Sequence, residues 1–203
     1  MTGRTLAVIS AGLRQPSSTR LLADQLAAAT ERALPSLDVQ ATDLREYAHD
    51  ITNHLLTGFP AGGLRKVLDT VARADGLIAV TPIFNGAYSG LFKSFFDVVS
   101  AGETEGSLAG KPVLIAATGG TARHSLALEH GLRPMFAYLH AVVVPTAVFA
   151  APEDWGGATA RGTLTARIDR AAAELAAELT RRAPTAPPDP FADPTPFEQL
   201  LSS

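Results

Sequence analysis

Runs of consecutive apolar residues alternate along the chain with longer segments in which apolar residues recur at helical spacing. An apolar run without polar alternation is typical of a strand that is buried on both faces, as in a parallel sheet. Apolar residues on one face of a longer segment indicate an amphipathic helix. Apolar runs, with one weaker segment at 37–44, predict strands at 5–9, 37–44, 76–80, 112–117 and 142–149. Helical spacing predicts helices at 19–34, 63–74, 90–100, 125–140 and 158–182.

Strands and helices therefore alternate from residue 5 to residue 182. Right-handed crossovers between successive strands produce a parallel sheet that is covered by helices on both faces. We expect an α/β fold with a five-stranded parallel sheet. The segment 1–182 shows no repeat and no internal boundary, so we expect it to form one domain.

The last segment, 183–203, has a different composition. It contains six prolines, which exclude a helix and a central strand. Its large apolar residues are unusual for a plain solvated tail, and they are Phe191, Phe197, Leu200 and Leu201. Two interpretations stay open, a frayed tail and a strap that docks on this subunit or on a neighbouring one.

Composition narrows the classes of function. The net charge is −3 and the sequence contains no basic stripe, which argues against nucleic acid as the main partner. The absence of cysteine excludes disulfides, thiolate catalysis and cysteine-based metal sites. No signal peptide and no membrane span is predicted, so we expect a cytoplasmic protein.

The loop after the first strand is rich in hydroxyl groups. In an open parallel sheet, ligands bind beyond the carboxyl ends of the strands, and this loop also leads into the start of a helix, which favours an anion. Helix capping needs a single hydroxyl, and the loop offers four hydroxyls and two arginines. We therefore favour a phosphate cradle over ordinary capping. The four hydroxyl residues and two arginines of this loop are Ser10, Ser17, Ser18, Thr19, Arg14 and Arg20.

Two further loops follow strands at the same predicted edge. The segment 81–90 contains glycines between aromatic residues, and 118–124 contains a Gly-Gly pair, which allows backbone to approach a planar ligand closely. The chain lacks the G-x-G-x-x-G pattern of tight dinucleotide binding. The segment 106–112 only imitates a phosphate-binding loop and is expected to be a turn into the next strand. A phosphate at the first loop and a flat ring between the other two describe a mononucleotide.

Three segments carry a resemblance to a known family. They are the hydroxyl loop 10–20, the segment Pro82–Lys93 (PIFNGAYSGLFK), and the segments 110–120 and 126–134 (GKP…ATGG…LALEHGLRP). The chain resembles the flavodoxin-like NAD(P)H-dependent FMN reductases, especially the flavin reductases that supply two-component monooxygenases. The resemblance covers most of residues 5–150, and the Pro-rich tail has no clear counterpart.

The resemblance implies a flavodoxin-like fold, FMN and NADPH or NADH as cofactors, and a role for each loop. The FMN phosphate would be held by Ser10, Arg14, Ser17, Ser18 and Thr19. The flavin ring would be lined by Pro82, Phe84, Asn85, Gly86, Ala87 and Tyr88, with Ser89 and Gly90 turning into the helix. The polar edge of the ring would meet Thr118, Gly119 and Gly120. Asn85 stands where many relatives have Lys.

The remaining charged residues and histidines that we considered are interpreted as structural rather than catalytic. Lys93 and Asp97 are spaced for a surface ion pair on a helix. His49 and His54 are expected on a loop, solvated and without metal. His130 occupies the place of an inserted residue that bulges a helix at a subunit interface in sulfonate-linked relatives, which favours FMN as an exchangeable substrate over a permanently bound group.

The implied reaction is hydride transfer from NAD(P)H to FMN, for which we expect no catalytic side chain, because the cofactor supplies the chemistry. A partner monooxygenase and a homodimer or homotetramer are implied by the resemblance. Alternatives are an FMN-containing quinone, azo or chromate reductase, a flavodoxin-type electron carrier, and a binding module for a non-flavin phosphate ligand.

Overall fold

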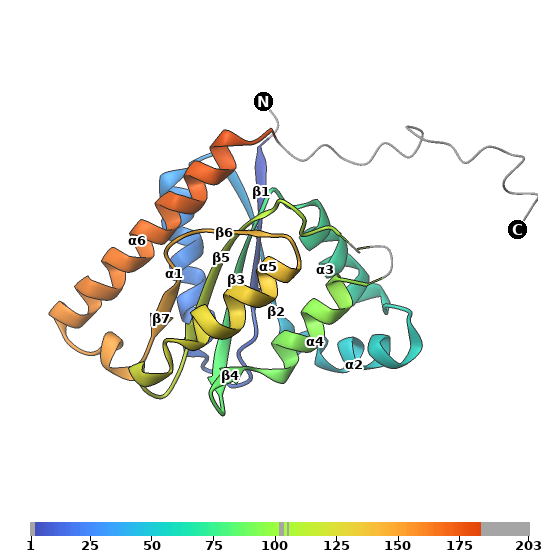
Figure 1. The fold of residues 1–203 in the computed structure, drawn as a ribbon, viewed down its shortest axis with the longest axis horizontal. Coiled ribbons are helices and arrows are strands. Elements are labelled where there is room, and N and C mark those ends of the chain that lie inside the picture. Colours follow the sequence, from blue (N-terminus) through green and yellow to red (C-terminus); the bar gives the residue numbers. More distant parts are fainter. Residues whose placement is uncertain (1–2, 102–103, 105, 184–203) are drawn as a thin grey trace, which may run out of the picture.

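A computed structural model describes residues 3–101, 104 and 106–183. Its centre is a parallel sheet with the strand order β2-β1-β3-β5-β6 (Figure 1). Two short strands are added: β7 pairs with β5 in parallel, and β4 pairs with β3 in antiparallel orientation. The strands are β1 Arg4–Ser10, β2 Leu37–Asp43, β3 Gly76–Phe84, β4 Ala87–Tyr88, β5 Pro112–Thr118, β6 Val142–Val143 and β7 Val148–Ala150. The predicted α/β class and parallel sheet are confirmed.

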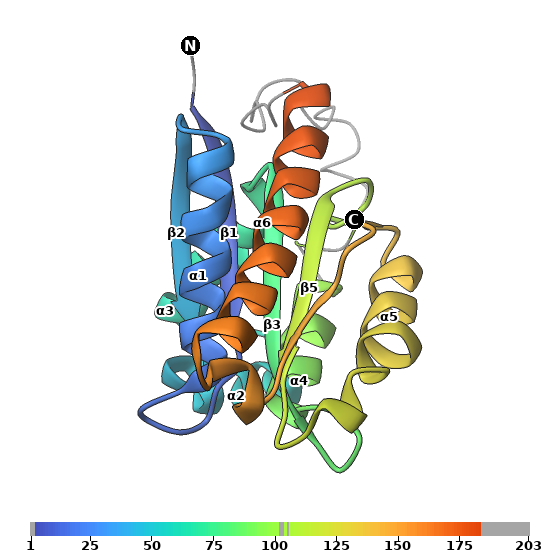
Figure 2. The ribbon, with the colours of Figure 1, turned by 90° about the vertical axis from the view of Figure 1, so that its left-hand side faces the viewer.

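The helices cover both faces of the sheet. They are α1 Ser18–Ala33, α2 Ala48–Thr57, α3 Gly62–Arg73, α4 Gly90–Val99, α5 Arg133–Tyr138 and α6 Ala158–Arg181. Figure 2 shows α1 and α6 side by side over one face, with α5 on the other side of the sheet. Successive side chains of a strand point to opposite faces, so β1 contributes Leu6 and Val8 to the core beneath α1 and α6, and Ala7 and Ile9 to the opposite core.

The core on the α3, α4 and α5 side is rich in aromatic rings. Phe92 and Phe96 of α4 are buried, and their ring centroids lie 4.7 Å apart. Phe96 also meets Phe136 of α5 edge to face at 4.9 Å. Such pairs add about 0.5–1.5 kcal/mol each beyond the area they bury. The predicted apolar side of helix 90–100 is therefore packed within the domain.

Three predictions of secondary structure need correction. The strand predicted at 142–149 is divided into β6 and β7, and Pro145 lies between them, where its missing N–H interrupts a ladder. The helix predicted at 125–140 is a 3-10 turn at Ala122–His124, a π-helix at Leu128–Leu132 and then α5. Helix α2 was not predicted; Ile51 is its one fully buried residue, and its other large apolar residues, Leu55 and Leu56, are exposed.

The edge of the sheet where the strands begin is closed by long polar side chains. The Lys111 ammonium is buried and donates to the carbonyls of Val71 and Ala72 at the end of α3. The Arg182 guanidinium at the end of α6 donates to the Gly110 carbonyl. The segment before β5 is thus the turn predicted from the sequence, with Gly110 at φ 69°. The predicted tail lies, apart from its first residue, outside the described residues.

No helix within the described residues has the length and apolar content that a membrane span requires.

Candidate functional site

The loop after β1 leads directly into α1, as predicted. Ser17 is the N-cap of this helix, and its Oγ accepts a hydrogen bond from the Arg20 backbone N–H at 3.2 Å. The capping interpretation is therefore correct for Ser17. Ser18 is exposed, and its hydroxyl has no hydrogen bond within the described residues. It remains available at a helix start, where backbone N–H groups attract an anion.

Gly12 makes this loop compact. A Cβ atom built at this position would lie 2.1 Å from Ser17 Oγ and 3.2 Å from Thr19 Cβ. The loop therefore folds back against the start of α1 in a way that only glycine permits. Arg14 lies at the exposed tip of the loop.

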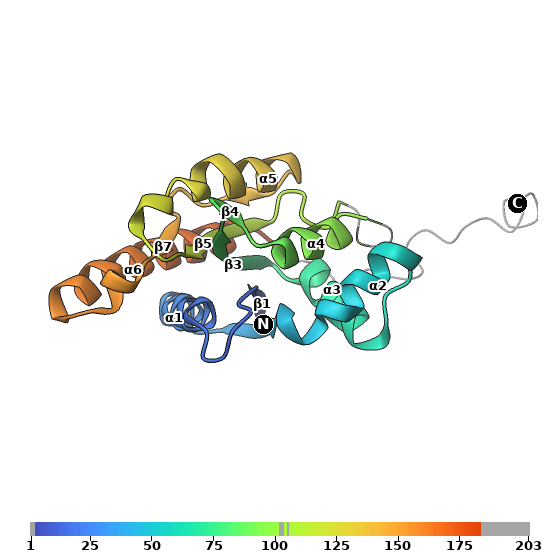
Figure 3. The ribbon, with the colours of Figure 1, turned by 90° about the horizontal axis from the view of Figure 1, so that it is seen from below.

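The structure joins the three predicted loops. The Thr19 and Thr118 hydroxyls, from the starts of α1 and of the third loop, share a buried hydrogen bond of 2.8 Å. Thr118 is also in register with Pro82 of β3, and Ser10 is in register with Val80. Segments distant in the sequence therefore meet at one edge of the sheet, which faces the viewer in Figure 3.

The second predicted loop is a β-hairpin. Strand β3 continues to Phe84, and Ala87 pairs with Phe84 across the turn. Asn85 and Gly86 have φ values of 51° and 80°, the left-handed region that an Asn-Gly hairpin turn requires. The Asn-Gly pair was the signal in the sequence that would have predicted this hairpin.

The hairpin divides its predicted ring-binding residues into two groups. Pro82 is buried within β3, whereas Phe84 is 48% exposed. The turn residues and Ala87 are exposed, and Tyr88 is half-buried. Ser89 caps α4 by accepting a hydrogen bond from the Phe92 N–H at 3.2 Å, which confirms its predicted place at the turn into the helix.

The third loop lies against an aromatic ring that the prediction did not include. A Cβ atom at Gly119 would lie 2.8 Å from Cζ of Phe149, so glycine is required for this contact. Gly120 is exposed, with nothing within 4 Å of a Cβ built there. The Ala122 N–H donates to the Glu153 carboxylate at 3.3 Å, which connects the loop to the 3-10 turn Pro152–Trp155.

Asp43 is a second residue that the sequence prediction missed. It ends β2 in register with Ser10, which is 1% exposed. Burial raises the pKa of the Asp43 carboxyl, opposed by a hydrogen bond from the Arg45 backbone and by the charge of Arg20. Asp43 Oδ1 and Ser10 Oγ are both buried without a hydrogen-bond partner in the described part of the chain. The Ser10 hydroxyl can donate to a bound group or accept from it, whereas the ionised Asp43 carboxylate can only accept.

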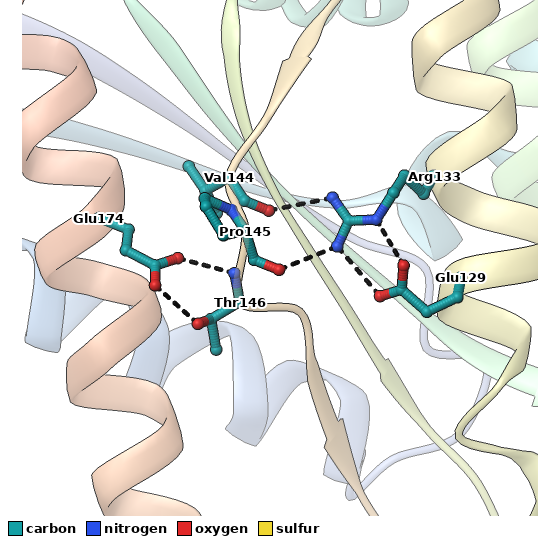
Figure 4. Close-up of polar contacts among 6 residues, drawn as sticks. All are labelled: Glu129, Arg133, Val144, Pro145, Thr146 and Glu174. Atoms are coloured by element: carbon teal, nitrogen blue, oxygen red, sulfur yellow. Dashed lines mark hydrogen bonds and ion pairs between the residues drawn. The ribbon is translucent and has the colours of Figure 1, made fainter.

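The bulge predicted at His130 is confirmed, since His130 lies within the π-helix Leu128–Leu132 and is exposed. Glu129 and Arg133 brace it with two hydrogen bonds, of 2.6 and 3.0 Å, which lower the pKa of Glu129. Arg133 also donates to the carbonyls of Val144 and Pro145, both at 3.1 Å (Figure 4).

The same connection between β6 and β7 is held from the other side. Glu174 of α6 accepts hydrogen bonds from the Thr146 N–H and hydroxyl, each at 2.7 Å (Figure 4). The connection leads to Phe149, so the bulged helix and α6 together fix the strand on which the third loop rests.

The remaining polar predictions have different outcomes. Lys93 and Asp97 form the expected exposed ion pair. His49 and His54 lie on helix α2, so their predicted place on a loop is wrong. No group of three or more potential metal ligands occurs among the described residues.

The sheet order and the joined loops define a flavodoxin-like protein with a candidate mononucleotide site at the carboxyl edge. Residues 4–156 match the family described as NADPH-dependent FMN reductase, and the chain belongs to this family.

Similar proteins support this assignment. An FMN reductase (NADPH) from Pseudomonas aeruginosa is 37% identical over 172 residues, which is 84% of this chain and 89% of the relative. A relative from Pseudomonas putida, named NADH-dependent FMN reductase SfnF, is 36% identical over 72% of this chain and 76% of its own. The crystal structure of an oxidoreductase from Corynebacterium diphtheriae is 42% identical, with a TM-score of 0.84, and covers 90% of this chain and 100% of its own.

Proposed function

We propose that this protein is an NAD(P)H-dependent FMN reductase that transfers a hydride from the nicotinamide to FMN. The observation that carries the proposal is the buried Thr19–Thr118 hydrogen bond, which joins the helix start to the glycine loop. This contact gives one ligand simultaneous access to a cluster of hydroxyls and to exposed backbone beside a flat surface.

The residues present fit FMN. In this proposal the phosphate binds at the loop folded around Gly12, beside the Ser10 hydroxyl that has no partner in the described residues, and it contacts Arg14, Ser17, Ser18 and Thr19. Phe84 and Tyr88, with the exposed turn between them, offer a wall for the flavin ring, and Gly119 and Gly120 present backbone to its polar edge. When bound, the flavin supplies the hydride-accepting chemistry. The protein contributes orientation and backbone donors that stabilise negative charge.

The reduced flavin is proposed to leave for a partner monooxygenase in the cytoplasm. The π-helix around His130 supports this version, because an exposed bulge is available for contact with another subunit. A homodimer or homotetramer is part of the same proposal.

The test combines a spectrum with an assay. The purified protein is examined for flavin absorbance, and oxidation of NADPH and NADH is then followed with and without added FMN. A colourless protein whose turnover saturates with FMN is the expected result. A yellow protein that turns over only with a quinone would overturn the exchangeable-substrate version, and no oxidation of either nucleotide would overturn the reductase proposal.

A further inference from the structure

A cleft of about 350 Å³ lies between α1, α6 and the 3-10 turn Pro152–Trp155. None of the predicted site residues lines it. The wall is formed by Leu21, Gln25, Trp155, Arg161, Leu164 and Thr165. Its volume is in the usual range for small-molecule sites.

The lining combines a flat aromatic surface with a fixed cation. Trp155 is half-buried, Leu21 is 47% exposed although it is a large apolar residue, and Leu164 closes the floor at 2% exposed. Arg161 is exposed, and its Nε donates to the Trp155 backbone carbonyl at 2.9 Å, which ties the guanidinium to the turn that carries the indole. The terminal nitrogens of Arg161 have no hydrogen-bond partner within the described residues, and they match the geometry of a phosphate.

The charge of the lining separates this cleft from its neighbour. No carboxylate lines it, and Asp24, next to Gln25 in the sequence, is already paired with Arg20 at 2.7 Å. A cleft of about 400 Å³ beside the third loop has three acidic residues and one arginine in its wall, and that Arg167 is paired with Asp154 at 2.7 Å. The charge of its lining therefore makes the first cleft the better fit for a phosphorylated ligand.

The cleft also adjoins the proposed flavin edge from two sides. The Leu21 N–H donates to the Ser17 carbonyl, so the cleft begins one helical turn from the loop proposed to hold the phosphate. On the other side, Trp155 ends the 3-10 turn whose Glu153 accepts from the third loop. A long ligand at this edge therefore reaches the cleft without crossing the sheet.

We infer that this cleft binds the phosphorylated adenosine end of a dinucleotide, with the adenine stacked on Trp155 and a phosphate on Arg161. Gln25 and Thr165 add an amide and a hydroxyl for the edge of the base or for the ribose. The source of the adenosine is NADPH, and this part of the inference rests on the proposed reductase function. FAD carries related chemistry, and the experiment distinguishes the two sources.

Trp155 is the single tryptophan of the chain, so intrinsic fluorescence reports directly on this cleft. The full-length protein, free of flavin and NADPH, is titrated with 2′,5′-ADP and with 5′-AMP. We expect a saturable fluorescence change with 2′,5′-ADP, weakened about tenfold or more by Arg161→Ala and partly restored by Arg161→Lys. Arg170→Ala is the matched control, because Arg170 is exposed on the same helix and does not line the cleft. No saturable change in the wild-type protein, or equal binding by wild type and Arg161→Ala, overturns the inference.

Steady-state kinetics identify the source of the adenosine. We expect Arg161→Ala to raise KM for NADPH about tenfold, with little change in kcat or in KM for FMN. A rise in KM for FAD alone would overturn NADPH as the source and assign the cleft to a flavin dinucleotide. The fluorescence measurement is independent of turnover. Binding of 2′,5′-ADP by a protein without reductase activity refutes the proposed function alone, and reductase activity without such binding refutes this inference alone.

Discussion

Lys111 and Ser10 are buried polar residues at opposite edges of the sheet, and of these two side chains only that of Lys111 has hydrogen-bond partners within the described residues. At the edge where strands begin, Lys111 and Arg182 reach across the ends of elements to bond backbone carbonyls. At the edge where strands end, Ser10 and Asp43 keep buried oxygens without a partner, and Gly120 leaves backbone exposed.

The difference separates stability from binding on one scaffold. A group that is satisfied internally stabilises the fold but offers nothing to a ligand, whereas an unsatisfied buried group costs stability until a ligand completes it. Substitutions at the first edge should therefore change the free energy of unfolding, and substitutions at the second should change flavin affinity.

The largest effect is expected at Lys111. Burial lowers its pKa to about 8 from 10.5, with the Asp75 carboxylate opposing the shift. Below pH 8 the side chain is protonated in both the folded and the unfolded state. Between pH 8 and 10.5 the folded protein has released a proton that the unfolded chain still binds, so the free energy of unfolding rises by up to about 3 kcal/mol.

Lys111→Met lacks this pH-dependent contribution. Urea unfolding of both proteins at about pH 7.5 and about pH 10 tests this, because the free energy of unfolding of the wild type minus that of the variant should increase with pH. The variant's FMN reductase activity per folded molecule should equal that of the wild type. The same pH dependence in both proteins would contradict the prediction.

At the opposite edge, Gly120→Val should weaken FMN binding about tenfold, or about 1.4 kcal/mol, because its side chain occupies the space where the ring would approach. Nothing lies within 4 Å of a Cβ at Gly120, so the melting temperature should stay unchanged. Gly119→Val is the informative contrast, since its Cβ meets Phe149 at 2.8 Å and should lower stability as well. Flavin titration and thermal unfolding separate the two; unchanged FMN affinity in Gly120→Val would refute the ring assignment.

Ser18→Ala is expected to reduce FMN affinity about fivefold, or about 1 kcal/mol, through loss of one phosphate contact. The free energy of unfolding should not change, because Ser17 rather than Ser18 caps α1. Ser36→Ala makes the same change at an exposed position before β2 and serves as the control. Equal affinities of the two variants in a flavin titration would place the phosphate elsewhere.

The smallest effect is expected at Ser10. Ser10→Ala removes a buried hydroxyl that has no partner, so the flavin-free protein should gain about 0.5 kcal/mol of unfolding free energy. FMN should bind less tightly to this variant, which reverses the sign when flavin is present. Chemical unfolding with and without FMN tests both signs, and a loss of stability without flavin would show that the hydroxyl is satisfied in the folded protein.

Local patterns predicted the elements well where burial is strong. The apolar runs around Val8, Ile78 and Leu114 are buried on both faces of the sheet, and the sequence predicted each of them correctly as a strand. The prediction failed at α2, whose contact with the core depends on Ile51, and at 142–149, where Pro145 divides a continuous apolar run. The hairpin at Asn85-Gly86 was within reach of the sequence, because that dipeptide is a strong turn signal.

The sequence by itself determined the alternation of strands and helices, the glycines at the carboxyl edge and the hydroxyls of the first loop. Each of these depends on neighbours within a few residues, which periodicity and turn chemistry encode. The tertiary structure alone decided that Thr19 meets Thr118, 99 residues away, and that Leu21, Trp155 and Arg161 line one cleft. Those contacts depend on how the crossovers place α1, β5 and α6, and no local pattern of side chains records that placement.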